Sequence, residues 1–485
     1  MFNAPYSMRN GAKTNLNKEH GKLNIFSPMK RALTLLAGLL LATLSEAQNP
    51  DSVFLRRLAD EILVNSKAYE NLRQLTKGVG GRLAGSPAMA RAERWGQGAL
   101  ESAGAERVWL QECLVPHWVR GGKDRFEIRL IGAKGRKPRT LHALALGNSP
   151  GSNGPLTAPV LVVRDFAELD AKKDSVKGKI VFFNYKFNPR FVHTFEAYSD
   201  AGIYRGQGPV RAAKYGAVGV AIRSLSGGTD NFPHTGTTAS GDTIRTVPSV
   251  ALGLRDADLL DSLLRGGQPV VATLQTFGRF LPDTIGHNVI GELRGTETPD
   301  EIITIGGHLD SWDPAEGAHD DGAGIVHTIE VLRAFRALGY RPKHTIRFVL
   351  FANEENGLRG GRKYAEEAKA KGERHIFALE SDEGGFTPRG FGLTASDEQF
   401  AKFRSWASLL APYGASELRR GGGGSDIGPL GRQGTPTCGF IPDSQRYFDV
   451  HHASNDVFEN VNKRELELGA VNIAALIYLV DKYGL

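Results

Sequence analysis

From about residue 284 onward, short apolar runs alternate with stretches that have the apolar spacing of amphipathic helices. Each apolar run is followed by a loop and then by such a stretch. The expected strands cover residues 302–305, 345–351 and 375–379, and the expected helices cover residues 323–338, 359–371, 399–410 and 463–482. Repeated strand–helix units predict an α/β fold with a mixed, mostly parallel sheet and helices on both of its faces.

The first half of the chain has two other patterns. Residues 51–104 show helical spacing, with helices expected at 54–63 and 88–103. A glycine-rich segment, residues 78–86, lies between them; it is expected to connect the two helices, and binding of an anion is the alternative. Strand-like runs follow at 108–110 and 125–130.

A glycine-, serine- and proline-rich segment at residues 147–159 indicates a domain boundary. Short buried-strand runs follow it, several of them separated by glycine-rich loops, and predict a small β-rich module. The expected strands there are 160–163, 179–183, 217–222, 247–251 and 270–274, with one helix at 208–216. We therefore expect residues 48–150 and 284–485 to form a main domain, with residues 151–283 inserted between its two parts.

Residues 1–47 have the pattern of a secretory signal peptide. A basic segment, Met29 to Arg31, precedes an apolar run from Ala32 to Leu44, and small residues follow at Ser45 and Ala47. Met29 is a better start for such a signal than Met1. The pattern predicts a secreted or periplasmic protein with no stable membrane span after signal removal, and a single-span anchor is the alternative.

Charge and cysteine content exclude some classes of function. The formal net charge is +7, and six Lys or Arg side chains against two Glu in residues 1–47 account for +4 of it. The remaining sequence has no basic tract typical of nucleic-acid binding, so no nucleic acid is expected as a partner. Cys113 and Cys438 are the only cysteines. They could form one disulfide or stay as buried thiols, but they are too few for a cysteine-based metal site.

Histidines and acidic residues follow each of the three predicted parallel strands. The groups are His308, Asp310, His319, Asp320 and Asp321; then Asn353, Glu354 and Glu355; then Glu380, Asp382 and Glu383; with His451, His452 and Asp456 before the last helix. Because parallel strands end at one edge of the sheet, these side chains should converge. Imidazoles and carboxylates without thiolates suit zinc or manganese. Taken alone, Glu383 or Asp313 would be interpreted as a helix-capping acid.

These motifs resemble the co-catalytic zinc exopeptidases, a family of aminopeptidases and carboxypeptidases. The resemblance covers residues 50–485 and is strongest to the carboxypeptidase Q branch at residues 116–121, 309–313 and 447–452. The middle module, residues 151–283, resembles the protease-associated domain inserted in many members.

The resemblance implies a role for each residue of the site. Asp320 would bridge two Zn²⁺ ions, with His308 and Asp382 completing one metal site and Glu355 and His452 the other. Glu354 would be the general base, and Asp310 would orient His308. The peptide bond between Asp320 and Asp321 would be cis. His451 is the fallback for His452. His319 departs from the pattern because it is a possible ligand beside the bridging residue, although solvent exposure is the favoured interpretation. Tyr447, Gly423, Gly424 and Ser425 are the candidate oxyanion and substrate residues.

The expected activity is hydrolysis of dipeptides or short peptides by a hydroxide held between two zinc ions. A carboxypeptidase of the carboxypeptidase Q type is favoured, and an aminopeptidase is the alternative. The same fold would also suit a single-zinc acyltransferase resembling glutaminyl cyclase, or a non-catalytic receptor. A peptide substrate is the expected partner, with a homodimer as a possible assembly.

Overall fold

The computed structural model describes residues 49–132, 137–239 and 246–485. The signal peptide expected over residues 1–47 therefore lies outside the described residues. Within these three ranges, no helix is both long and apolar enough to cross a membrane.

The main sheet has eight strands and combines parallel with antiparallel pairs. Its order is β1 (Arg107–Val119), β10 (Arg279–Leu293), β12 (His344–Phe351), β11 (Thr298–His308), β13 (Arg374–Glu380), β16 (Thr437–Pro442), β14 (Pro388–Thr394) and β15 (Glu417–Arg420). Strand β11 pairs in parallel with both β12 and β13, and β13 pairs in parallel with β16. Strand β10 is antiparallel to both of its neighbours. The predicted mixed α/β sheet is thus confirmed.

Helices cover both faces of this sheet, as the alternation of side chains along β12 shows. Phe348 and Leu350 belong to a core that includes residues of α4 (Pro87–Ala103), α8 (Ala323–Ala337) and α13 (Lys463–Tyr483). Val349 and Phe351 point to the other face and pack with residues of α9 (Arg359–Lys371) and α12 (Gly428–Gly431). Because successive side chains of a strand point to opposite faces, β12 contributes to two cores, which accounts for the apolar run from Phe348 to Phe351 at its carboxyl end.

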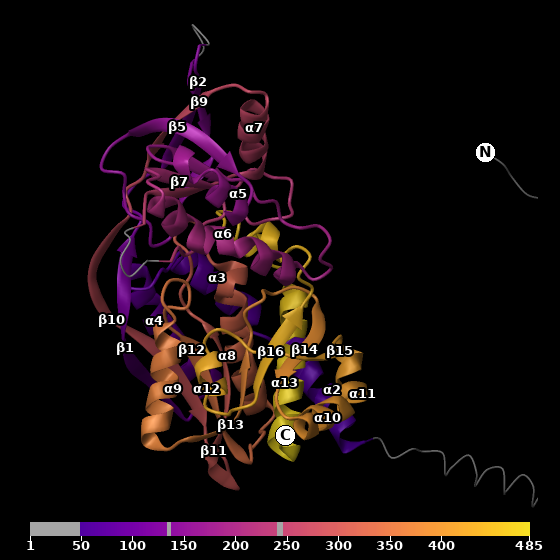
Figure 1. The fold of residues 1–485 in the computed structure, drawn as a ribbon. Helices are drawn as coiled ribbons and strands as arrows, with labels where there is room; N and C mark the ends of the chain where they lie inside the picture. Colours follow the sequence, from indigo (N-terminus) through magenta and orange to yellow (C-terminus); the bar gives the residue numbers. More distant parts are fainter. Residues whose placement is uncertain (1–48, 133–136, 240–245) are drawn as a thin grey trace, which may run out of the picture. The chain divides into compact units, whose positions relative to one another are not determined.

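The second sheet also has eight strands. Its order is β3 (Arg139–Leu141), β2 (Arg125–Leu130), β9 (Val270–Gln275), β5 (Leu156–Val163), β6 (Ile180–Phe183), β7 (Gly219–Arg223), β8 (Ser249–Leu252) and β4 (Ala143–Ala145). It begins before residue 151, where composition placed the boundary, because β2 and β5 both pair with β9. The chain enters this sheet after β1 and leaves it through β10 (Figure 1).

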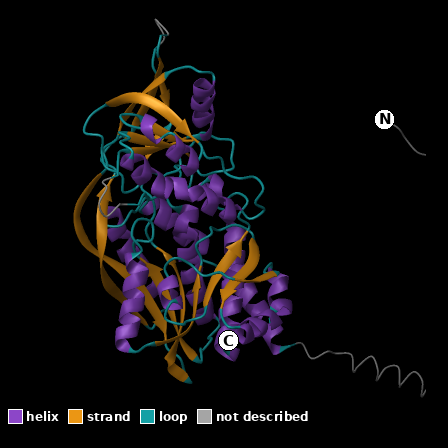
Figure 2. Ribbon diagram, viewed as in Figure 1, coloured by secondary structure: helices purple, strands orange, loops and turns teal. Residues whose placement is uncertain are grey.

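The second sheet carries more helix than expected, as Figure 2 shows. It is accompanied by α5 (Phe166–Ala171), α6 (Thr194–Lys214) and α7 (Leu254–Arg265). The predicted helix at 208–216 is only the end of α6, which has 21 residues and continues through Pro209. Glycines and a proline within α6 hid its length from an analysis of local propensity.

The remaining helices are α2 (Pro50–Asn65), α3 (Ala68–Gly78), α10 (Asp397–Ser405) and α11 (Ala407–Leu410), the last two replacing the single helix expected at 399–410. The glycine-rich segment 78–86 connects α3 to α4, as predicted. Ser86 ends it by capping α4, since its side chain accepts a hydrogen bond from the amide of Met89.

Cys113 on β1 and Cys438 on β16 are both buried free thiols.

Candidate metal centre

Three neighbouring strands of the main sheet deliver the predicted ligands to one edge. In the parallel register His308, the last residue of β11, stands opposite Phe351, the last residue of β12. On the other side, Gly306 stands opposite Glu380, the last residue of β13. The loops after the three strands therefore begin side by side.

Asp320 lies between two groups of side chains. Its Oδ1 is 3.2 Å from Nε2 of His308, and that nitrogen is also 3.2 Å from Oδ1 of Asp382. Its Oδ2 is 3.2 Å from Nε2 of His452, which is 3.1 Å from Oε2 of Glu355. The five predicted ligands thus form two triads that share Asp320. The peptide bond between Asp320 and Asp321 is cis, as the resemblance implied.

The donor atoms of this centre suit cations. Oε1 of Glu355 is buried and has no hydrogen-bond partner within the part of the chain that the structure describes. Burial raises the pKa of Glu355 to about 7 and that of the adjacent Glu354 to about 8. Burial also opposes ionisation of Asp320, but hydrogen bonds from His308 and His452 lower its pKa well below the usual value. Two bound divalent cations would compensate these buried charges, so the residues present fit a two-metal site.

Buried carboxylates hold the ligand-bearing loops in place. Asp310 accepts hydrogen bonds from the backbone amides of Glu354 and Glu355, at 3.0 and 3.3 Å. The nearest partner of Nδ1 of His308 is the backbone carbonyl of Asp310 at 3.0 Å, whereas the carboxylate is 3.7 Å away. Asp310 therefore orients His308 mainly through its main chain, and its side chain fixes the loop after β12. Asp456 does the same for the bridging residue, because its Oδ2 accepts from the amide of Asp320.

Arg82, in the glycine-rich connection, holds the loop after β11 and was not predicted from sequence. Its side chain is fully buried and donates to the backbone carbonyls of Leu309, Glu316 and Gly317, at 2.5, 2.7 and 3.0 Å. It also places a positive charge near the aspartates of the centre, Asp310 among them. No local sequence signal distinguishes this arginine, since all three of these partners lie more than 200 residues away.

Residues 234–238, in the segment between β7 and β8 of the second sheet, also contribute to the centre. The carbonyl of Thr235 lies 3.3 Å from Nδ1 of His452, and the amide of Thr235 donates to the carbonyl of His452 at 2.9 Å. Oγ1 of Thr237 donates to the carbonyl of Glu355 at 2.5 Å. His234 is buried, with Nδ1 2.7 Å from the carbonyl of His451. Such contacts from outside the ligand set orient metal-binding imidazoles.

The two additional histidines have different surroundings. His319 is buried rather than solvent-exposed, which corrects the expectation. Its ring stacks on Phe386 at 4.1 Å, and its two nitrogens lie 3.2 Å from the carbonyl of Asn460 and the amide of Gly385. His319 is therefore fully partnered and does not compete for metal. His451 stacks on His452, with its Nε2 3.6 Å from Oδ2 of Asp320, so it remains a possible alternative ligand.

A cavity of about 570 Å³ opens onto the ligands. Of the candidate substrate residues, Tyr447 and Ser425 line it. Gly423 and Gly424 do not; a Cβ on Gly424 would stand 2.1 Å from Cδ of Glu380, so the glycine lets this loop pass close to β13.

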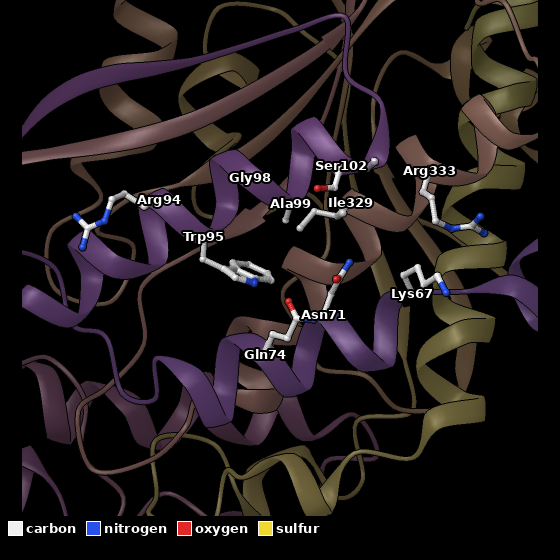
Figure 3. Close-up of a pocket in the computed structure, with 11 residues that line it drawn as sticks. Lys67, Asn71, Gln74, Arg94, Trp95, Gly98, Ala99, Ser102, Ile329 and Arg333 are labelled. Carbon is white, nitrogen blue, oxygen red and sulfur yellow. The ribbon is translucent and has the colours of Figure 1, made fainter.

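A second cavity, of about 450 Å³, lies between α3, α4 and α8 (Figure 3). Asn71 and Gln74 extend from α3 towards Trp95 of α4, while Arg94 and Arg333 point away on opposite sides. None of the described residues lining it carries an imidazole or a carboxylate. Of these two cavities, only the larger one can hold the expected metals.

Known proteins resemble the chain in sequence and in structure. The model of Peptidase family M28 matches residues 288–477. Mouse carboxypeptidase Q is 33% identical over 419 residues, which cover 86% of each chain, and human carboxypeptidase Q is 32% identical over the same length. The crystal structure of a Peptidase M28 precursor from Shewanella amazonensis is 32% identical, with a TM-score of 0.83 over 89% of this chain and 96% of that one.

More distant structures share the fold. The zinc aminopeptidase from Bacillus subtilis superimposes with a TM-score of 0.59 at 22% identity, over 85% of this chain and 94% of its own. The similarity to carboxypeptidase Q extends over most of the chain, and two groups of ligand-type side chains meet at the carboxyl edge of its sheet. The chain therefore belongs to peptidase family M28 and is a metallo-exopeptidase.

Proposed function

We propose that this protein hydrolyses dipeptides or short peptides at a centre of two zinc ions. The observation that carries the proposal is the position of Asp320, whose two carboxylate oxygens face different histidines, His308 and His452. A single-metal site would need only one of the two triads. Similarity to carboxypeptidase Q at 33% identity favours carboxypeptidase activity, and aminopeptidase activity is the alternative.

His308, Asp320 and Asp382 would hold one zinc ion, and Asp320, Glu355 and His452 the other. When bound, these ions supply Lewis-acid polarisation of the scissile carbonyl and lower the pKa of water at the site. The carbonyl groups of Asp310 and Thr235 accept from the imidazoles and present the opposite ring nitrogen to the cations.

Glu354 is the proposed general base. It lines the cavity next to Glu355, and Asp310 fixes its backbone amide. Burial and the neighbouring carboxylates, Asp382 and Glu355 among them, raise its pKa to about 8, and cations nearby would lower it into the range for accepting a proton from water. The carboxylate takes a proton from the attacking water and delivers it to the nitrogen of the leaving amine.

Tyr447 is the proposed donor to the developing oxyanion. Its ring is buried and lies 5.3 Å from that of Phe195, which limits its orientation. Within residues 49–132, 137–239 and 246–485, its hydroxyl has no hydrogen-bond partner, so it is available to substrate. A positioned donor of this kind stabilises the charge that builds on the carbonyl oxygen.

The decisive experiment compares the wild-type protein with Glu354→Gln. Both should hold about two zinc ions per chain, because the substituted residue is not a ligand. The variant should hydrolyse a free dipeptide about 100- to 10,000-fold more slowly. Assays with free, amino-blocked and carboxyl-blocked dipeptides identify the end that is trimmed.

Metal content also distinguishes this function from the two others that the fold would suit. A single-zinc acyltransferase would contain about one zinc per chain and cyclise rather than hydrolyse, and a receptor would hold none or be inactive. If zinc is lost together with activity in Glu354→Gln, the assignment of Glu354 as a base is wrong.

The proposal extends to the second sheet, the amino terminus and the assembly. The second sheet, with its α5–α7 helices, is proposed to be the inserted protease-associated domain. Export from the cytoplasm follows from the signal-like pattern of residues 1–47 and is tested by amino-terminal sequencing of the mature protein. A homodimer is tested by light scattering.

A further inference from the structure

The cavity between α3, α4 and α8 has an aromatic end and a charged end (Figure 3). Trp95 of α4 lies at one end and Lys67, which precedes α3, lies at the other, with the amide of Asn71 between them. Ile329 of α8 adds an apolar side chain to the lining. The cavity has a volume of about 450 Å³, so it offers both kinds of surface to one small molecule.

Several polar side chains of this cavity lack a protein partner. Among the residues that the structure describes, no hydrogen bond is made by the amide of Asn71, the indole N–H of Trp95 or the hydroxyl of Ser102. In the same ranges, no carboxylate lies within 4.0 Å of the ammonium of Lys67. Water or a ligand must therefore satisfy these groups.

The charges around the cavity suit an anion. No acidic side chain is among its described lining residues. The charge of Arg333 is matched by Glu61 and Glu330, at 2.8 and 2.7 Å, and Arg94 points away from the cavity. Lys67 is thus the unmatched cation that the lining presents, next to neutral N–H donors. One ammonium with such donors suits a single carboxylate, and the indole suits an aromatic or apolar group attached to it.

Gly98 of α4 keeps part of the cavity open. No atom lies within 4 Å of a Cβ built on this residue, although it lines the cavity. A larger side chain at this position would fit the fold and occupy the space that a ligand needs. Gly98 therefore provides a way to fill the cavity without displacing protein atoms.

We infer that this cavity binds a compact organic acid, with an aromatic or apolar group against Trp95 and a carboxylate between Lys67 and Asn71. The cavity shares no described lining residue with the one that opens onto the metal ligands. The acid is therefore a second ligand, distinct from the peptide substrate of the proposed function.

Calorimetric titration of the zinc-loaded full-length protein with 3-phenylpropionate and with the neutral 3-phenylpropionamide tests the chemistry of the ligand. The acid should bind about 3- to 10-fold more tightly, a modest preference because Lys67 is exposed and water screens its charge. Lys67→Gln should remove this preference by weakening binding of the acid alone. Arg73→Gln is the matched control, because Arg73 is exposed on α3, pairs with Glu70 at 2.6 Å and does not line the cavity.

Gly98→Leu tests the place of binding. It should weaken binding of both compounds by about 10-fold or more, because leucine occupies the space of the ligand's ring. Its urea unfolding midpoint should not fall, since leucine favours a helix more than glycine does and meets no neighbouring atom at its Cβ.

Four results would each overturn the inference. They are a dissociation constant of the acid above about 10 mM, equal affinity for acid and amide, a preference that survives Lys67→Gln, and binding that persists in Gly98→Leu. Because none of these measurements depends on peptide hydrolysis, a failure of the proposed function would leave their outcome unchanged.

Discussion

Replacement of Arg82 by methionine tests how the loop after β11 is held. Methionine fills much of the same space but cannot donate to the carbonyls of Leu309, Glu316 and Gly317. It also removes a buried positive charge from beside the aspartates of the centre. We expect Arg82→Met to lower both the free energy of unfolding and the affinity for zinc.

The size of the effect follows from the three hydrogen bonds. Each buried carbonyl that loses its donor costs about 1–3 kcal/mol, and the removal of one partner from a buried charged network typically costs about 3–5 kcal/mol in total. Because methionine avoids the cost of burying a guanidinium, we expect a loss of about 3–4 kcal/mol. Disturbed support of ligands usually lowers metal affinity by about 10- to 100-fold.

Urea unfolding, followed by tryptophan fluorescence in metal-free protein, measures the first quantity, and competition with a chelator measures the second. Arg91→Met is the control, because Arg91 is exposed on α4 and its side chain donates a 3.3 Å bond to the carbonyl of Pro87 in the same helix. Surface changes of this kind alter stability by about 0.5 kcal/mol or less. A loss below about 1 kcal/mol in Arg82→Met, with unchanged zinc affinity, would refute the reasoning.

Three further substitutions probe other contacts. His327 is buried, which lowers its pKa to about 4, so the unfolded chain takes up the proton first as pH falls. The free energy of unfolding should therefore decrease below pH 6.5, and His327→Gln should remove about 2 kcal/mol of that decrease at pH 5. Urea unfolding at pH 7 and pH 5 measures the difference. Gly424→Ala forces a Cβ against Glu380 and should lower stability by about 1–3 kcal/mol and reduce kcat/KM. Thr237→Val removes the bond to the carbonyl of Glu355 and should weaken zinc binding by about 10-fold in the chelator assay.

For each of these three predictions, one result would show that its physical reason is wrong. An identical pH dependence in wild type and His327→Gln would show that this histidine does not titrate between pH 5 and 7. Gly98→Ala is the control for Gly424, because nothing lies within 4 Å of a Cβ at Gly98; equal effects of the two changes would exclude close packing as the cause. Unaltered zinc affinity in Thr237→Val would show that the threonine does not support the metal loop.

The convergence of three of the proposed ligands could be predicted from sequence because each ends or closely follows an apolar run that forms a buried parallel strand. His308 ends β11, and Glu355 and Asp382 follow the ends of β12 and β13 within a few residues. Parallel pairing then makes their convergence a matter of topology rather than of side-chain detail. The helix expected at residues 359–371 also has the observed bounds of α9, because Gly372 ends it in the left-handed conformation that glycine favours.

The supports of the centre could not be predicted in this way. Arg82 and Thr235 act through long-range contacts that leave no periodic signal, and Thr235 does so through main-chain atoms alone. The start of the second sheet at Arg125 depends on pairing between strands that are more than 100 residues apart. Local composition reports turns and boundaries, but not which distant strand completes a sheet.

The contacts of Thr235 with His452 also bear on how the enzyme is made. Thr235 and His452 lie 217 residues apart in sequence. A polypeptide that leaves the ribosome from its amino end therefore exposes Thr235 long before the imidazole that this threonine contacts has been made. The proposed centre can assemble only after parts of both sheets have been synthesised, so hydrolytic competence is a late product of folding rather than a property of either sheet alone.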